Sequence, residues 1–134
     1  MKVTVDTNIL VRAVVRYDEK QADAASALLL DAEVIAVSLT CLCEFVWVLR
    51  RVYGIGQDDI AAALEALLAA GNVVVNRPAV EAGMVILKAG GDFADGAIAY
   101  EGRWLGCDTF VSFDKKAVEL IAEGGHTARL LEAV

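Results

Sequence analysis

Short β-branched segments that alternate with longer helix-forming segments constrain the fold of this chain most strongly. The expected strands are Lys2–Val5, Val34–Val37, Val73–Val75, Thr109–Ser112 and, near the C-terminal end, Ala128–Leu131. Strands that alternate with helices are typical of a parallel sheet covered on both faces. We therefore predict an α/β fold with a central parallel sheet of four to five strands flanked by helices.

Helix signals fill the gaps between these strands. Ser38 is placed to cap one helix, and Pro78 suits the first turn of another. The predicted helices are Ile9–Val15, Asp18–Leu30, one that follows Ser38 as far as Tyr53, Ile60–Ala70, one from Pro78 to Gly90-Gly91, Ala94–Leu105 and Ala117–Ala122. No linker, repeat or low-complexity segment interrupts them, so we expect a single domain over residues 1–134.

Composition excludes several classes of protein. Hydrophobic residues make up 57% of the 134 residues, which suits a compact core and excludes a disordered chain. No apolar run reaches the ~18 residues of a membrane span, and the N-terminus lacks the apolar stretch of a signal peptide. We therefore expect a cytoplasmic protein with no membrane partner. The three cysteines, Cys41, Cys43 and Cys107, are expected to be small buried thiols, and the single histidine, His126, excludes a His-rich zinc site.

Two aspartates lie just past the ends of predicted strands. Asp6 follows the first strand, and Asp114 follows Thr109–Ser112. In open α/β sheets, sites form at the carboxyl ends of strands. An aspartate at such a position also commonly caps the next helix. Two of them at equivalent ends of one parallel sheet nevertheless favour a functional interpretation.

Glu44 lies within a segment, Cys41–Leu49, that is apolar nearly all round. Such a helix is expected to be mostly buried, where an ionised carboxylate is costly unless it is paired or binds a metal. Arg51 is close to the same helix face, but it lies two turns away. We therefore interpret Glu44 as a functional acid rather than as half of a salt bridge.

Asp92 and Asp95 begin another predicted helix, directly after Gly90-Gly91. Their spacing places both carboxylates near one face of the first turn, where exposed amides favour negative charge. Asp92 is interpreted chiefly as an N-cap. Asp95 is interpreted as functional, because the small residues that begin with Gly96 would let the helix pack close to the sheet.

Together, these acids indicate hard-cation chemistry. Carboxylate oxygens are the ligands that Mg²⁺ and Mn²⁺ prefer, and four like charges would repel one another strongly without a cation. We expect one or two such ions to be held by Asp6, Glu44, Asp95 and Asp114. The ions would activate a water and stabilise the charge that builds on a phosphodiester, so no side-chain nucleophile is required.

The acids fall within four short motifs. These are Val5-Asp6-Thr7-Asn8, Glu44 in an early helix, Asp92-Phe93-Ala94-Asp95-Gly96-Ala97-Ile98-Ala99, and Ser112-Phe113-Asp114. In order and spacing they resemble the motifs of PIN domains over essentially the whole chain, and the chain length is similar to that of the VapC toxins of prokaryotic toxin–antitoxin pairs. The resemblance implies a PIN-like nuclease domain over residues 1–134 with Mg²⁺- or Mn²⁺-dependent endoribonuclease activity.

The resemblance also implies roles for individual residues and for partners. Catalytic and metal-binding roles fall on Asp6, Glu44, Asp95 and Asp114. Supporting positions are Asp92, which is often acidic in the family, and the polar residues Thr7, Asn8 and Ser112, which orient the acids. Gly96 departs from the family, in which alanine is more usual. The implied partners are an RNA substrate, a VapB-like antitoxin that places a basic side chain among the acids, and a second copy of the chain in a homodimer.

The net charge of −7 opposes general nucleic-acid binding, because phosphate contacts need local positive charge. Five of the 19 acidic residues belong to the candidate site, however, and the remaining acids nearly balance the 12 basic residues. Arg12 and Arg16 lie on the first helix, and Lys115 and Lys116 follow Asp114. These four cations are candidate RNA-phosphate contacts, with solvated faces or ion pairs as the alternative.

Other classes of protein also cluster acids at strand ends. A haloacid-dehalogenase-like phosphatase needs a second acid two residues after the first, where this chain has Asn8. A phosphoacceptor signalling domain begins with adjacent acids, where this chain has Asp6 alone. A PIN-like module that only binds RNA is disfavoured because all four acids are present. Cleavage of DNA stays open, because nothing in the sequence selects a 2′-hydroxyl.

Two tryptophans bear on the oligomeric state. Trp47, Trp104 and the apolar helix around Glu44 provide more large apolar side chains than a small core requires. The excess favours hydrophobic surface for a dimer, and burial in the core is the alternative.

Overall fold

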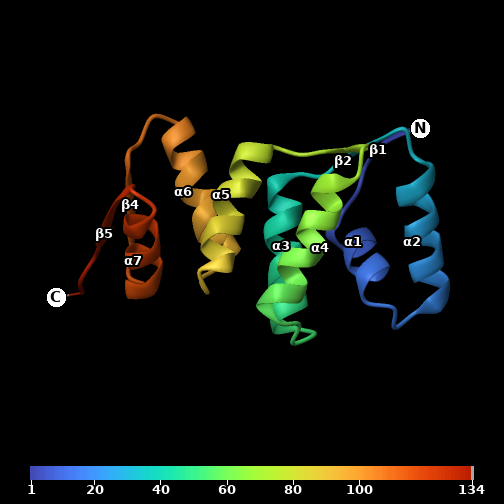
Figure 1. Ribbon diagram of the computed structural model, residues 1–134, viewed down its shortest axis with the longest axis horizontal. Coiled ribbons are helices and arrows are strands. Elements are labelled where there is room, and N and C mark those ends of the chain that lie inside the picture. Colours follow the sequence, from blue (N-terminus) through green and yellow to red (C-terminus); the bar gives the residue numbers. More distant parts are fainter. Residues whose placement is uncertain (134) are drawn as a thin grey trace. The chain divides into compact units, whose positions relative to one another are not determined.

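The computed structural model describes residues 1–133, and the chain forms two compact units. We refer to Met1–Asn76 as the N-terminal unit and to Arg77–Val134 as the C-terminal unit. Each has its own helices and its own parallel strands (Figure 1). The single domain expected from the sequence stays a prediction.

The N-terminal unit is a three-stranded parallel sheet with four helices. Its elements are β1 (Lys2–Thr4), α1 (Thr7–Val14), α2 (Glu19–Asp31), β2 (Val34–Ala36), α3 (Leu39–Arg51), α4 (Gln57–Ala69) and β3 (Val73–Val74). The strand order is β1-β2-β3, with Val3 opposite Ile35 and Ile35 opposite Val73. Figure 1 shows α3 and α4 side by side, and the two helices are in contact.

The core of this unit follows from helical periodicity. Along α3 the buried residues are Cys41, Leu42, Phe45, Val46 and Leu49, at the spacing of one apolar stripe. Other buried side chains of this unit include Leu10, Ile35, Ile60 and Leu64, and α3 is in contact with α1 and α4. One face of α3 therefore anchors the unit, and its other face is left for polar groups.

The C-terminal unit pairs two helices with a strand–helix–strand segment. Its elements are α5 (Arg77–Lys88), α6 (Phe93–Trp104), β4 (Thr109–Ser112), α7 (Lys115–Glu123) and β5 (Thr127–Leu130). β4 and β5 are parallel, with Thr109 opposite Thr127. α5 and α6 pack closely, since a Cβ added at Gly96 would lie 2.3 Å from the carbonyl oxygen of Ala82. Gly96 therefore lets α6 approach α5, whereas Ala99, a later residue of the same small-residue run, packs in one cluster with Phe110 of β4 and brings α6 against the strands as expected.

The predicted α/β class with parallel strands is confirmed, but the single sheet of four to five strands is wrong. The strands form one sheet of three and one pair. The physical reason is local connectivity: α7 carries the chain from β4 directly to β5, and these strands use their four residues to pair with each other. The sequence pattern identifies strands, but it does not say which strand each one pairs with.

Several local predictions are confirmed. The Ser38 side chain caps α3 by accepting the N–H of Cys41 at 3.1 Å, and Pro78 lies in the first turn of α5. Burial of the cysteines is confirmed for Cys41, whereas Cys43 is half-buried and Cys107 is exposed. Cys107 escapes burial because it lies in the turn after α6, outside the apolar stripe. No helix within residues 1–133 is long and apolar enough to cross a membrane.

Candidate active site

Asp6 stands at the junction between β1 and α1. Its exposed side chain caps α1, with Oδ1 accepting the N–H of Ile9 at 3.2 Å. A carboxylate at this position satisfies a helix N–H and is favoured by the helix dipole. The cap uses one of the two carboxylate oxygens and fixes the direction of the other.

Thr7 and Glu44 join α1 to α3 beside Asp6. The Thr7 hydroxyl donates to Oε2 of Glu44 at 3.3 Å and also lies 3.8 Å from Sγ of Cys41. Thr7 thus contacts one of the predicted site acids, and its role in orienting that acid stays a prediction. The expected burial of Glu44 is wrong, because its side chain is exposed on the face of α3 that carries Trp47. The prediction relied on the overall apolar composition of this helix. The buried residues of α3 form a stripe on one face, and Glu44 lies outside that stripe.

Cys41 lies under this group of side chains and is not a nucleophile candidate. Burial raises the pKa of the Cys41 thiol; the charges of Asp6 and Glu44 raise it further, while the hydrogen bond from Thr7 acts in the opposite direction. A buried thiol with a raised pKa stays protonated at neutral pH and is chemically inert. Acyl- or phosphoryl-enzyme chemistry through this cysteine is therefore disfavoured.

Three further acids lie in the C-terminal unit. Asp92 caps α6 through the N–H of Ala94 at 3.1 Å, which confirms its interpretation as an N-cap. Asp114 caps α7, with Oδ1 accepting the N–H groups of Lys116 at 3.0 Å and Ala117 at 3.3 Å. Asp95 lies in the first turn of α6 and is half-buried.

Among these three acids, Asp95 is the one whose ionised form is least favourable. Partial burial raises the pKa of Asp95, and the negative charges of Asp92 and Asp114 raise it further. Both effects disfavour the ionised carboxylate. A cation placed among the three acids would relieve that repulsion.

Two polar contacts set the backbone around Asp114. The Ser112 hydroxyl accepts the N–H of Asp114 at 3.0 Å, and the supporting role expected for Ser112 stays a prediction. Lys116 donates from Nζ to the carbonyl oxygen of Gly90 at 2.6 Å, at the turn that leads into Asp92. Sequence reasoning missed this contact, because no local pattern predicts a bond between residues 26 positions apart.

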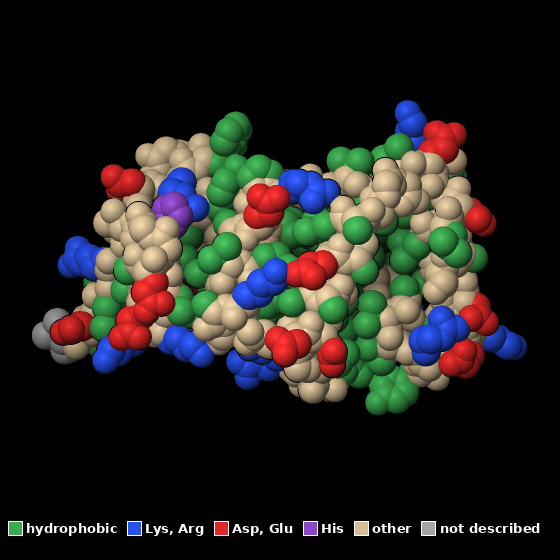
Figure 2. All heavy atoms as spheres, in the orientation of Figure 1, with side chains coloured by type: hydrophobic (Ala, Val, Ile, Leu, Met, Phe, Trp, Pro, Cys, Tyr) green, Lys and Arg blue, Asp and Glu red, His purple; other side chains and the backbone are tan. Residues whose placement is uncertain are grey.

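The candidate RNA-contacting cations differ in their surroundings. Arg16 is held by Glu19, at 3.0 Å, and by Asp23, and Lys115 lies 4.0 Å from Glu119. Within the described residues, the partly buried Arg12 has neither a hydrogen bond nor an ion pair. On the face shown in Figure 2, Lys and Arg side chains are interspersed with Asp and Glu side chains. On this face, an RNA contact would therefore rely on individual cations rather than on a continuous basic patch.

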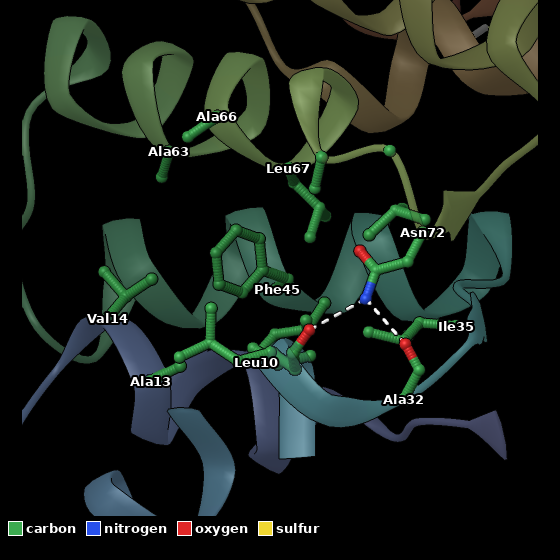
Figure 3. Close-up of a pocket in the computed structure, with 15 residues that line it drawn as sticks. Leu10, Ala13, Val14, Ala32, Ile35, Phe45, Ala63, Ala66, Leu67 and Asn72 are labelled. Atoms are coloured by element: carbon green, nitrogen blue, oxygen red, sulfur yellow. Dashed lines mark hydrogen bonds between the residues drawn. The ribbon is translucent and has the colours of Figure 1, made fainter. Parts of the chain in front are cut away.

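The N-terminal unit contains two hollows of similar size. One, of about 560 Å³, is lined mainly by apolar side chains, and Figure 3 shows Leu10, Phe45 and Leu67 around it. Its amide group, Asn72 Nδ2, is already bonded to the carbonyl oxygens of Leu29 and Ala32. The other, of about 530 Å³, is lined by Asp6, Asn8 and Arg12 on one side and by residues of α2 on the other. Only the second contains acid and base side chains suited to chemistry.

The donor set fits a hard divalent cation. Within residues 1–133, no group of three or more His, Cys, Asp or Glu side chains is close enough to form a preassembled metal site. The available donors are nevertheless carboxylates, and each of the capping aspartates engages the backbone through Oδ1 alone. Carboxylate oxygens in a crowded acidic setting are the chemistry that Mg²⁺ and Mn²⁺ select.

The chain is an α/β protein in which an aspartate follows the carboxyl end of a parallel strand in each unit, Asp6 after β1 and Asp114 after β4. The family of PIN domains matches residues 3–122, and the chain belongs to the PIN domain family. PIN domains are generally nucleases, a class of hydrolases that acts on nucleic acids, and they typically use divalent metal ions. No curated protein matches the chain.

Proposed function

We propose that the chain is an Mg²⁺- or Mn²⁺-dependent endoribonuclease. The observation that carries the proposal is the half-buried Asp95, whose charge is opposed by Asp92 and Asp114 in a protein of a nuclease family. Such repulsion lowers stability unless a cation or a proton offsets it. A nuclease has a direct use for that cation, which stabilises negative charge on a phosphodiester.

The proposed ligands are Asp6 and Glu44 of the N-terminal unit and Asp95 and Asp114 of the C-terminal unit. Helix capping directs Asp6 and Asp114, and the Thr7 hydroxyl holds one oxygen of Glu44. The bound cation would supply Lewis-acid stabilisation and a water of lowered pKa. Asn8 lines the same hollow as Asp6, which is consistent with its proposed supporting role of orienting the acids.

Cleavage of a labelled single-stranded RNA tests this activity. Purified protein should produce internal cuts in Mg²⁺ or Mn²⁺, and an excess of EDTA should stop them. A DNA strand of the same sequence should be cut more slowly if the enzyme selects RNA. Undiminished RNA cleavage in EDTA would falsify the metal-dependent mechanism.

We further propose that the enzyme is a VapC-type toxin restrained by a VapB-like antitoxin. The order and spacing of the acidic motifs support this assignment, and an acidic site favours a charge-assisted pair with an antitoxin Arg or Lys. The toxin should arrest growth when expressed alone, and co-expression of the small protein encoded next to it should relieve the arrest. Growth that is unaffected by the active enzyme would contradict the toxin assignment.

A homodimer is also part of the proposal. Trp47 and Trp104 are 57% and 79% exposed, so neither side chain is buried in the core. Exposed tryptophans are enriched at protein interfaces. Light scattering across a concentration series should give twice the chain mass, and a monomer at all concentrations would contradict the homodimer.

A further inference from the structure

We propose that the hollow between α1 and α2 binds one nucleotide of a single-stranded RNA, with the Arg12 guanidinium on its phosphate. The inference rests on the proposed nuclease function and specifies how its substrate is held. The hollow lies entirely within the N-terminal unit, and its lining residues belong to α1, its Asp6 cap and α2.

The position of the hollow connects it with the candidate active site. Asp6 lines it together with Asn8, Ile9 and Arg12 from α1. Asn8 and Arg12 are four residues apart, so they lie on one face of the helix. A nucleotide in the hollow would thus place its phosphate within a turn or two of helix from an acid of the proposed metal site.

Arg12 is the lining residue best suited to bind an anion. Its side chain is partly buried, and within the described residues it makes no hydrogen bond or ion pair. A guanidinium whose five N–H donors have no protein partner can bind a bidentate oxyanion such as phosphate. Arg16, which lies past the end of α1 rather than on it, is already paired with Glu19 and Asp23.

The remaining lining residues suit a base. Ala24, Ala25 and Leu28 of α2 supply an apolar wall, and Gln21 at its end offers both amide donors and an acceptor. The volume of about 530 Å³ falls in the ~300–1,000 Å³ range of small-ligand sites. Bases splayed out of single-stranded RNA are recognised by such combinations of apolar contact and edge hydrogen bonds, whereas a paired base is not accessible.

Two matched charge variants test the phosphate contact. Arg12→Gln and Arg16→Gln each remove one positive charge, but only the first removes the proposed contact. Both are made in an Asp114→Asn background, and binding of a labelled mixed-sequence 12-nucleotide RNA is followed by fluorescence anisotropy in EDTA over a salt series. We expect Arg12→Gln to weaken binding about tenfold and to lower the slope of log K against log salt by about 0.7. Arg16→Gln should change neither by more than about twofold.

A second pair of variants tests the hollow without changing charge. Ala24→Leu adds bulk to a lining residue, and Ala27→Leu adds the same bulk at an exposed position of α2 outside the lining. We expect Ala24→Leu to weaken RNA binding severalfold with an unchanged salt slope, and Ala27→Leu to leave it unchanged. Equal behaviour of the two leucine variants would show that the hollow is not occupied.

The outcomes separate this inference from the proposed function. Equal losses for the two arginine variants, or no RNA binding at all, would overturn the nucleotide site. Cation-dependent RNA cleavage by the wild type together with equal arginine variants would reject the site and keep the nuclease. Binding that depends on Arg12 in a protein that cleaves no RNA would support the site and reject the nuclease.

Discussion

Single carboxylates in this protein use one oxygen for helix capping and leave the other for the proposed cation. Asp6, Asp92 and Asp114 each cap a helix through Oδ1. Within the described residues, the other oxygen of each makes no hydrogen bond. Helix capping and cation binding are therefore compatible explanations for the same aspartate. Asp95, which caps no helix, has the clearest functional signal.

Asp95→Asn is expected to stabilise the protein in the absence of metal, and more so at high pH. Because the pKa of Asp95 is raised in the folded state, its contribution to stability is fully present below its unfolded pKa of about 3.9 and is lost as pH rises through the folded value. Urea denaturation in EDTA should thus give the variant a higher midpoint than wild type at pH 8 and a similar one at pH 4. A lower midpoint at pH 8 would show that the ionised carboxylate is favourable.

Asp92→Asn is the matched control for this effect. Asp92 is exposed, and asparagine retains the ability to cap α6. Asp92→Asn removes a charge near the same turn, but it should change the urea midpoint less than Asp95→Asn does. If Asp92→Asn stabilised the protein as much as Asp95→Asn or more, Asp92 would be the acid that experiences the strongest repulsion.

At the level of helices and strands, sequence predicts what is local. Ser38, Pro78 and Asp92 marked helix starts correctly because caps and first turns depend on neighbouring residues. The exposed Glu44 was missed because composition does not say which face of α3 is buried, and the spacing of Phe45 and Leu49 would have been the better signal. The division into two sheets depends on pairing between distant segments, which periodicity does not contain.

Gly96→Ala is expected to destabilise the packing of α5 against α6. The added Cβ would meet the backbone oxygen of Ala82, so the helices must part, at a cost of about 1–3 kcal/mol that outweighs the helix propensity of alanine. Gly102→Ala in the same helix meets no atom within 4 Å and should instead raise stability by about 0.5–1 kcal/mol. Thermal melts decide this, and equal effects of the two variants would contradict close helix contact.

Lys116 ties the start of α7 to the turn that leads into α6. Its Nζ donates to the Gly90 carbonyl, and Gly91 packs against Leu120, since a Cβ there would lie 2.5 Å from Cδ1 of Leu120. Lys116→Met should lower stability by about 0.5–1.5 kcal/mol and raise the Mg²⁺ concentration for half-maximal cleavage, with Lys116→Arg restoring both. Lys115→Met, which removes only an exposed pair with Glu119, is the control.

A different result would indicate that Lys116 contacts the RNA substrate directly. If Lys116→Met leaves the Mg²⁺ response unchanged but reduces the salt slope of RNA binding, the ammonium contacts phosphate instead of fixing the turn. The two roles are therefore distinguished by which titration shifts.

For the whole molecule, the proposed nuclease should depend on its cation for stability as well as for activity. Mg²⁺ should stabilise the wild type by mass action, by about 1–3 kcal/mol at ten- to hundredfold excess over Kd, and Asp95→Asn should gain less. KCl at matched ionic strength controls for general screening of the net charge of −7. The same rise in Tm with KCl as with Mg²⁺ would show that only screening is at work.

The most direct measurement compares RNA cleavage in Mg²⁺ by the wild type and by two variants in which an acid is replaced by its amide. Glu44→Gln alters an acid of the N-terminal unit, and Asp95→Asn alters one of the C-terminal unit. If the acids of both units serve one metal-dependent activity, each variant should lose about a hundredfold or more in rate while Asp92→Asn stays within severalfold of wild type. Full activity of either Glu44→Gln or Asp95→Asn would contradict the four-acid site.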